Sequence, residues 1–300
     1  MNTARPPNFS PTGERLFLFL GPDKTGSTYV DGLLREHPLV DSPTAKDLFF
    51  FNRNYALGIQ WYYGQFSNDG RLKAEVCHDY LFSATAAERI GALPLSMSYG
   101  VGARNPYERA ISAYHFMRFQ GRMNLEFETA LWQCDELLGH GDFSTHLPRW
   151  QKAAGDSDLF ILDFDELKES PSAYANHLFS SLGLPHLDQI PRIERNPARE
   201  PNMPGLIMRR GRLLAEALRR RGLTAAADRL KKTAHRIPSR SSPDPLPEFA
   251  DLRPATREKV VEVVARSSEA LRSIDGVERW PAWPSERPSG GSKHESPSRV

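Results

Sequence analysis

The sequence has few cysteines and no long apolar run, and each absence argues against a class of protein. Cys77 and Cys134 are the only two cysteines, so a disulfide framework is not expected, and the lack of a C-x-x-C pair argues against a zinc site. No apolar stretch approaches the roughly 20 residues that a membrane-spanning helix needs. Residues 1–15 contain no apolar core of the kind that a secretory signal has. We therefore expect a cytoplasmic protein without a membrane span.

The chain as a whole also lacks an excess of charge of one sign. It has 39 Lys and Arg residues against 37 Asp and Glu residues, a formal net charge of +2 over 300 residues. This composition is ordinary for a soluble globular domain, and it does not favour a nucleic-acid partner. Basic residues are nevertheless concentrated in residues 209–232. Three interpretations of this segment stay open: a solvated amphipathic surface helix, a lid that grips an anion, or a surface for nucleic acid or anionic membranes.

Strands and helices are predicted to alternate along a single domain. Residues 16–20, LFLFL, form a short continuous apolar run that is typical of a strand buried on both faces of a parallel sheet. The other predicted strands are residues 72–76, 96–104 and 158–167, and the main predicted helices are residues 27–37, 83–93, 105–120, 146–155, 170–184 and 255–274. This alternation predicts a three-layer α/β/α sandwich with a central parallel sheet, a P-loop-like nucleotide-binding fold.

The domain is predicted to span residues 15–283, between a flexible N-terminus at 1–14 and a disordered tail at 284–300 that is rich in Pro, Ser and Gly. Within it, residues 191–250 combine a Pro- and Arg-rich loop with the basic segment and form a candidate lid.

The loop after the first predicted strand, "GPDKTGST" at residues 21–28, has the glycine spacing of an ATP-binding loop but not its lysine. In that motif the second glycine is followed by Lys and then Ser or Thr, whereas here Lys24 lies between the glycines and Ser27 follows the second one. A loop between a buried strand and a helix N-terminus directs N–H groups at an anion. A lysine within it suits a group that is transferred without a metal ion, such as a sulfuryl group.

A second basic cluster is predicted at another strand-to-helix junction. Arg104 ends the strand at 96–104, and Ser112 lies eight residues later within the next helix, whose first turn contains Pro106. Arg104 can form a forked, charge-assisted bond to a phosphate, and Ser112 can add a hydroxyl donor. A sulfuryl donor that carries phosphates at both ends would need two such sites.

These motifs together resemble the sulfotransferase superfamily, in which "K-T-G-S/T-T" binds the 5′-phosphosulfate and "R-N/D-P-x-x-R-x-x-S-x-Y" binds the 3′-phosphate. The second motif is matched by Arg104, Asn105, Pro106, Arg109, Ser112 and Tyr114. Residues 46–62 and 143–184 are similar to segments of the heparan-sulfate-type carbohydrate sulfotransferases and their bacterial relatives, and the resemblance covers residues 15 to about 195. It implies a sulfotransferase that uses 3′-phosphoadenosine 5′-phosphosulfate (PAPS) as co-substrate, releases PAP, needs no metal, and acts on a glycan or small-molecule acceptor.

The resemblance also implies roles for individual residues. Lys24 would neutralise the departing 5′-phosphate, which is a transition-state role. Thr25, Gly26, Ser27 and Thr28 would supply N–H and hydroxyl donors, although a helix cap explains Ser27 or Thr28 equally well. The family's glycine- and lysine-bearing loop near the C-terminus has no recognisable counterpart, and Arg199, Arg209 and Arg210 are candidates for its function.

The general base for the acceptor hydroxyl is expected among three residues. Asp47 occupies the position of a glutamate in the heparan-sulfate-type enzymes and ranks first, His78 second and Glu75 third. The segment around Glu75 resembles a family stretch "E-K-x-x-x-Y-F" in which Val76 replaces the lysine, so no second catalytic lysine is expected from it. A local structural role for His78 stays an equal alternative.

The aromatic residues between Phe49 and Tyr63 are expected to be mainly core, with one or two rings left to line an acceptor cleft. Two functions compete with sulfuryl transfer: an ATP-dependent P-loop kinase, and a catalytically inactive nucleotide-binding protein that kept the fold. The absence of the G-K-[ST] order counts against the kinase, and the absence of a G-x-S-x-G elbow excludes the common hydrolase motif.

Overall fold

The computed structural model describes residues 15–191 except 68 and 156, residues 246–274, and a few positions between them: 200–201, 211, 213–215, 217–218, 226 and 239–240. The predicted flexible N-terminus, the tail at 284–300 and most of the candidate lid, with Arg199, Arg209 and Arg210, lie outside the described residues. The domain boundaries therefore stay predictions, as does the cytoplasmic location. No helix among the described residues combines the length and apolarity that a bilayer crossing requires.

A five-stranded sheet forms the centre of the domain, and each neighbouring pair of its strands is parallel. The strands are β1 (Arg15–Phe19), β2 (Val40–Asp41), β3 (Leu72–Val76), β4 (Ser96–Ala103) and β5 (Asp158–Asp163), in the order β2-β3-β1-β4-β5. The apolar run of β1 takes a central place, where both of its faces are buried. Because all strands run the same way, the loops after β1, β3 and β4 meet at one edge of the sheet.

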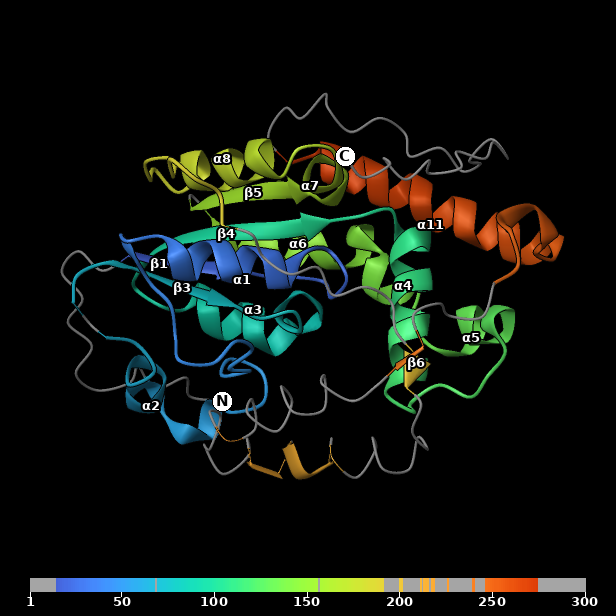
Figure 1. Cartoon of the computed structure of the whole chain (residues 1–300), viewed down its shortest axis with the longest axis horizontal. Coiled ribbons are helices and arrows are strands. Elements are labelled where there is room, and N and C mark those ends of the chain that lie inside the picture. The colour runs from blue at the N-terminus through green and yellow to red at the C-terminus, as the bar shows by residue number, and fades with distance from the viewer. Residues whose placement is uncertain are drawn as a thin grey trace, which may run out of the picture.

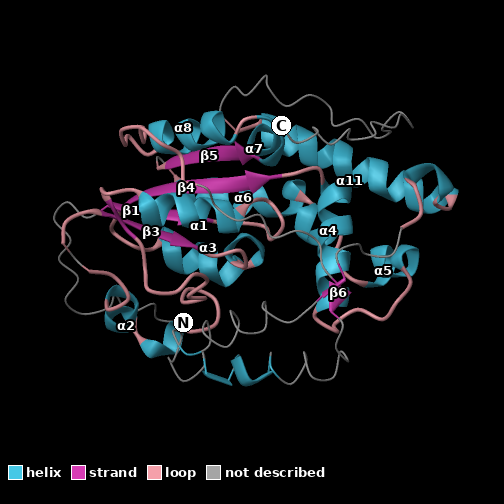
Figure 2. Ribbon diagram, viewed as in Figure 1, coloured by secondary structure: helices cyan, strands magenta, loops and turns pink. Residues whose placement is uncertain are grey.

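Helices cover both faces of the sheet, as Figures 1 and 2 show. On one face, Phe17 and Phe19 pack with apolar residues of α1 (Ser27–Glu36), α7 (Phe164–Glu169) and α8 (Pro171–Ser181). On the other face, Leu16 and Leu18 share a cluster with residues of α3 (Ala84–Gly91), α4 (Pro106–Phe119), α6 (Phe143–Ala154) and α11 (Pro254–Arg272). This arrangement confirms the predicted three-layer sandwich.

The remaining elements are short. They are α2 (Ile59–Tyr63), α5 (Phe127–Gln133), the 3₁₀ turns Tyr55–Leu57, Tyr80–Phe82, Gly139–Gly141 and Phe249–Asp251, and the antiparallel pair β6 (Glu200–Pro201) and β7 (Ser239–Arg240). The start of α4 follows from its sequence: the Asn105 side chain accepts hydrogen bonds from the N–H groups of Tyr107 and Glu108, and Pro106 occupies the first turn, as predicted.

The aromatic segment after Asp47 is mainly core, as predicted. Phe50, Phe51 and Tyr62 are completely buried, whereas Tyr55 is 39% exposed. These rings surround Glu75 on β3, whose two carboxyl oxygens accept hydrogen bonds from the hydroxyls of Tyr62 (2.9 Å) and Tyr80 (2.8 Å). Burial raises the pKa of Glu75 to about 8, and the two tyrosine hydrogen bonds oppose this rise only in part.

Replacement of Glu75 by Gln should change how stability depends on pH. The folded-state pKa of about 8 lies above the ordinary 4.5, so the stabilising contribution of the protonated carboxyl is complete below about 4.5 and is lost as the pH rises to about 8. Between these two pH values the free energy of unfolding should decrease with rising pH more steeply in the wild type than in Glu75→Gln. The difference between the two slopes should be up to about 1.4 kcal/mol per pH unit.

Urea unfolding at a series of pH values measures this difference. Glu88→Gln, at an exposed position on α3, serves as the matched control and should keep the wild-type slope. Equal slopes for the wild type and Glu75→Gln would contradict the assignment of a neutral buried carboxyl.

Candidate active site

The loop between β1 and α1 requires glycine at both Gly21 and Gly26, because of their backbone angles and their close neighbours. Both have positive φ angles, 83° at Gly21 and 91° at Gly26. A side chain at Gly21 would place its Cβ 2.5 Å from the carbonyl oxygen of His78, and one at Gly26 would come within 2.9 Å of a methyl group of Leu167. The loop therefore lies directly against the chain that follows β3, which brings two of the predicted site segments together.

The first turn of α1 presents its N–H groups to this loop. Gly26 is the N-cap residue, and no acidic side chain lies in the first turn. The hydroxyl of Thr25 donates to the carbonyl of Pro22 at 2.6 Å within the loop, which differs from its predicted role as a hydroxyl donor to a ligand. The backbone amides of Ser27 and Thr28 belong to the first turn of α1, at the positive end of the helix, and that of Thr25 directly precedes the N-cap.

Lys24 has a left-handed backbone (φ 67°), and its ammonium lies 3.8 Å from the centroid of the Phe116 ring. Burial lowers the pKa of Lys24 to about 8; Asp23 opposes the change, and the nearby cations Arg104, Arg109 and Lys46 add to it. An ammonium with a depressed pKa in a crowd of cations is typical of a site that binds an anion.

Arg104, predicted to bind a second phosphate, is bonded to the loop itself. Its Nη1 donates to the carbonyl oxygen of Lys24 at 3.0 Å, and its guanidinium lies 4.5 Å from the centroid of the Phe164 ring. Glu108 approaches it at 3.8 Å. The two predicted anion-binding sites are therefore connected by a direct contact.

Ser112 lies on the same face of α4 as these groups. Glu108, Ser112 and Phe116 follow one another at four-residue spacing, so they lie above one another on the helix. Arg104 contacts the backbone of Lys24 and Phe116 contacts its ammonium. The partly buried Ser112 is thus on the helix face that meets the loop.

Arg109 on α4 is completely buried and holds the loop through Asp23. Its Nη1 donates to the carboxylate of Asp23 at 2.5 Å, and its Nη2 donates to the carbonyls of Leu137, at 2.5 Å, and of Glu136. Burial alone would raise the pKa of Asp23, but Arg109, with smaller contributions from His78 and Lys24, holds it below its ordinary value. Arg109 matches the family motif, but its pairing with Asp23 could not be inferred from the motif alone.

Two of the three candidate bases form a hydrogen-bonded pair. Asp47 has a φ of 59°, and its backbone N–H donates to the carbonyl of Val76, so its side chain lies beside the residues that follow β3. Its Oδ1 is 2.8 Å from Nδ1 of His78, whose Nε2 is 3.0 Å from Asp79. The side chain of His78 is 28% exposed, against 3% for Asp47. Glu75 is separate from this pair, because it lies in the aromatic core with both oxygens bonded to tyrosines.

Sequence reasoning missed Lys46, which stands directly before Asp47. Its ammonium donates to the hydroxyl oxygens of Ser27, at 3.0 Å, and Thr28, at 3.4 Å. The one available signal was its place next to the predicted base. Reading Lys46 as a site residue required knowing that residues 44–47 lie beside the first turn of α1.

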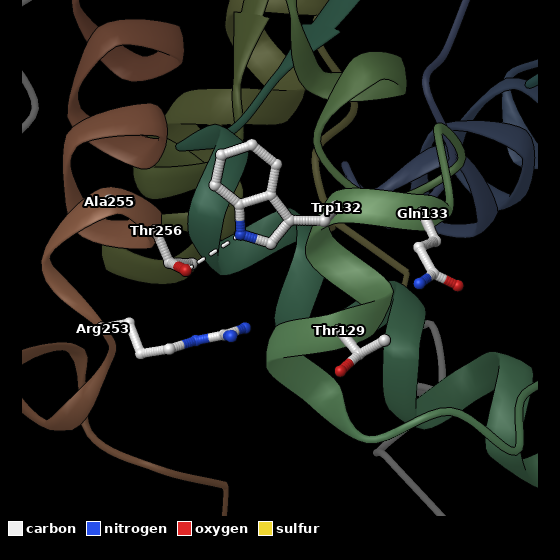
Figure 3. A pocket seen from close by; sticks show the side chains of 6 residues that line it. All are labelled: Thr129, Trp132, Gln133, Arg253, Ala255 and Thr256. Atoms are coloured by element: carbon white, nitrogen blue, oxygen red, sulfur yellow. Dashed lines mark hydrogen bonds between the residues drawn. The ribbon is translucent and has the colours of Figure 1, made fainter.

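A surface hollow of about 310 Å³ lies elsewhere, between α5 and the start of α11 (Figure 3). Its lining residues are Thr129, Trp132, Gln133, Arg253, Ala255 and Thr256. The indole N–H of Trp132 donates to Thr256 at 2.9 Å, which ties the two helices together. The lining contains none of the predicted site residues and no nucleophile–base pair, so the hollow adds nothing to the chemistry of the loop. Among the described residues, no group of three His, Cys, Asp or Glu side chains is arranged to hold a metal ion.

Comparison with known proteins agrees with the motifs. The family profile described as "Sulfotransferase domain" matches residues 14–196. The human bifunctional heparan sulfate N-deacetylase/N-sulfotransferase 2 is 30% identical over 196 residues, which cover 56% of this chain and 22% of that protein. A membrane-associated sulfotransferase, kil1, of Dictyostelium discoideum is 30% identical over 105 residues, which cover 33% of this chain and 22% of that protein. This chain thus spans about a fifth of the length of these curated relatives.

A solved structure supports the fold. The sulfotransferase from Alicyclobacillus acidocaldarius superposes with a TM-score of 0.51 at 21% identity, and the match covers 74% of this chain and 96% of that one. The family profile and the heparan sulfate relative confirm the predicted resemblance to the superfamily and to its heparan-sulfate-type members. Since the profile matches more than half of its 300 residues, this chain belongs to the sulfotransferase domain family.

Proposed function

We propose that this protein transfers the sulfuryl group of PAPS to a hydroxyl or amino group of a carbohydrate or small-molecule acceptor. The observation that carries the proposal is the convergence of Lys24, Lys46 and Arg104 on one loop at the positive end of α1, where no acidic residue occupies the first turn. Such a site favours a ligand with several negative charges. The name of the human relative, a bifunctional heparan sulfate N-deacetylase/N-sulfotransferase, supports a glycan acceptor.

The donor would lie with its 5′-phosphosulfate against the loop and its 3′-phosphate against Arg104 and Ser112. The amides of residues 25–28 and the hydroxyls of Ser27 and Thr28 would hold the phosphosulfate. In the transfer, the acceptor oxygen or nitrogen forms a bond to sulfur while the bond between sulfur and the bridging oxygen breaks. The released 5′-phosphate gains negative charge, which the Lys24 ammonium neutralises.

The acceptor proton would go to His78, with Asp47 as the group that orients it. His78 is the exposed member of the pair, and its Nδ1 is fixed by the nearly buried carboxylate of Asp47. Its Nε2 would exchange Asp79 for the acceptor group when the acceptor binds. This assignment reverses the predicted order of Asp47 and His78, and it leaves Glu75 as a structural carboxyl.

Binding of PAP tests the proposed function directly. Isothermal titration calorimetry should show PAP binding to the wild type, with an affinity at least tenfold lower for Arg104→Ala because a charge-assisted phosphate contact is lost. Arg35→Ala, on the last turn of α1, is the control and should bind PAP like the wild type. Tight binding of ATP with magnesium but none of PAP would overturn the proposal in favour of a kinase. Wild-type PAP binding without sulfate transfer to any acceptor would indicate an inactive nucleotide-binding protein.

Loss of the Lys24 ammonium should lower turnover more than donor affinity. Lys24→Ala should lower kcat about 100-fold or more, as is usual when one donor to a developing charge is removed. Because the pKa of Lys24 is about 8, the charged form is lost as the pH rises through that value, and kcat/KM of the wild type should fall there. Lys24→Arg keeps its charge and should lack this fall. A wild-type kcat/KM that is flat from pH 7 to 10 would contradict the role.

The two members of the base pair can be separated by substitution. His78→Ala should lower kcat about 100-fold or more with PAP affinity unchanged, because a general base is lost and the donor site is intact. Asp47→Asn should lower kcat less, since it removes only the group that orients the imidazole. Radiolabelled sulfate transfer at saturating donor measures both. A nearly active His78→Ala beside an inactive Asp47→Asn would return the role of base to Asp47.

A further inference from the structure

Lys46 lies on a short segment that is fixed at both ends. The N–H of Thr44 donates to the carbonyl of Gln65, and the N–H of Asp47 donates to the carbonyl of Val76. The segment therefore runs past the end of β3 toward the start of α1. Its position places a lysine next to the loop from a part of the chain that the loop motif does not include.

The ammonium of Lys46 is in an electrostatically unfavourable place. It contacts the hydroxyls of Ser27 and Thr28, the first two residues of α1, where the helix dipole is positive. It also repels Lys24, whose pKa it helps to lower. None of the ion pairs formed within the described part of the chain involves Lys46. An anion bound at the helix N-terminus would turn this repulsion into attraction.

The directions of the Lys46 hydrogen bonds determine which donors remain for a bound anion. An ammonium is a donor only, so Ser27 and Thr28 accept from Lys46 with their oxygens, and their hydroxyl hydrogens are left to donate elsewhere. Two contacts leave the ammonium one further hydrogen. The three groups together thus offer two O–H donors and one N–H donor beside the loop amides.

We infer that Lys46 is a second ammonium ligand of the 5′-phosphosulfate, supplied from residues 44–47 and not from β3. The family stretch after β3 would place a lysine at position 76, but Val76 is 1% exposed and packs with Phe19 and Val30. Lys46 brings an ammonium to the same end of the donor by another route. This inference rests on the proposed function and names one residue that determines recognition of the 5′ end.

Two ligands that differ only at the 5′ position test the inference. PAP has the 5′-phosphate and adenosine 3′-phosphate lacks it. Lys46→Ala should weaken PAP binding about tenfold, as expected for a lost charged hydrogen bond, and change the affinity for adenosine 3′-phosphate less than twofold. Lys46→Arg should restore most of the PAP affinity. Lys152→Ala, at an exposed position on α6, is the control and should bind both ligands like the wild type.

Thermal unfolding without ligand separates a binding role from a structural one. Lys46→Ala should unfold at the wild-type temperature or above it, because the substitution relieves repulsion. Three results for Lys46→Ala would each overturn the inference. They are an equal loss of affinity for both ligands, a PAP affinity that stays at the wild-type value, and an unfolding temperature below that of the wild type. If wild-type protein binds PAP and Lys46→Ala binds it equally well, only the inference fails; if the wild type does not bind PAP, the proposed function fails with it.

Discussion

The ion pair between Asp23 and the buried guanidinium of Arg109 is the interaction on which the site depends. A buried charge is tolerated when it is paired and hydrogen-bonded, and here the two terminal nitrogens of the guanidinium donate to the Asp23 carboxylate and to the carbonyls of Glu136 and Leu137, whereas its buried Nε has no hydrogen-bond partner. Removal of the Asp23 carboxylate would leave the buried guanidinium without a counter-charge. The loop, α4 and the turn at 136–137 are therefore held together as one unit. Lys24 follows Asp23 directly, so this pair helps to fix the backbone from which the Lys24 side chain starts.

The same loop also contacts the groups that would act on the acceptor. Gly21 lies so close to the backbone of His78 that no larger residue fits between them. His78 in turn is bonded to Asp47, and the neighbouring Lys46 is bonded to the first turn of α1. The groups that we propose for donor binding and for proton transfer from the acceptor thus belong to a closed ring of contacts that begins and ends at the β1–α1 junction. A shift of the loop would move both sets of groups at once.

Much of this arrangement was predictable from the sequence because local rules determine it. The apolar run of β1, the glycine spacing of the loop, and the Asn-Pro start of α4 each specify a conformation through nearby residues alone. Since strands in a parallel sheet end at one edge, the meeting of Lys24 and Arg104 also follows from the order of elements.

The partners that come from distant segments were not predictable in this way. Three contacts depend on how segments 13 to 86 residues apart in the chain pack together: the pairing of Arg109 with Asp23, the burial of Glu75 among tyrosines, and the contact of Lys46 with Ser27. Spacing along the chain contains no information on those contacts. Sequence analysis placed Asp47 first, His78 second and Glu75 third as the base. In the structure, Glu75 differs because both of its oxygens are bonded to tyrosines, and His78 differs because its side chain is 28% exposed.

The crowding of positive charge has a cost that links donor binding to protonation. Lys24 has a depressed pKa because it is buried among other cations, so part of its charge is absent near pH 8 when no anion is bound. A bound bisphosphate favours the charged ammonium and must raise that pKa, so binding at this pH takes up a proton. When the sulfuryl group leaves, the 5′-phosphate would gain negative charge. The Lys24 ammonium would then already be protonated, because the bound donor raised its pKa. In the proposed reaction, binding of the donor would thus create part of the positive charge that assists departure of its own 5′-phosphate.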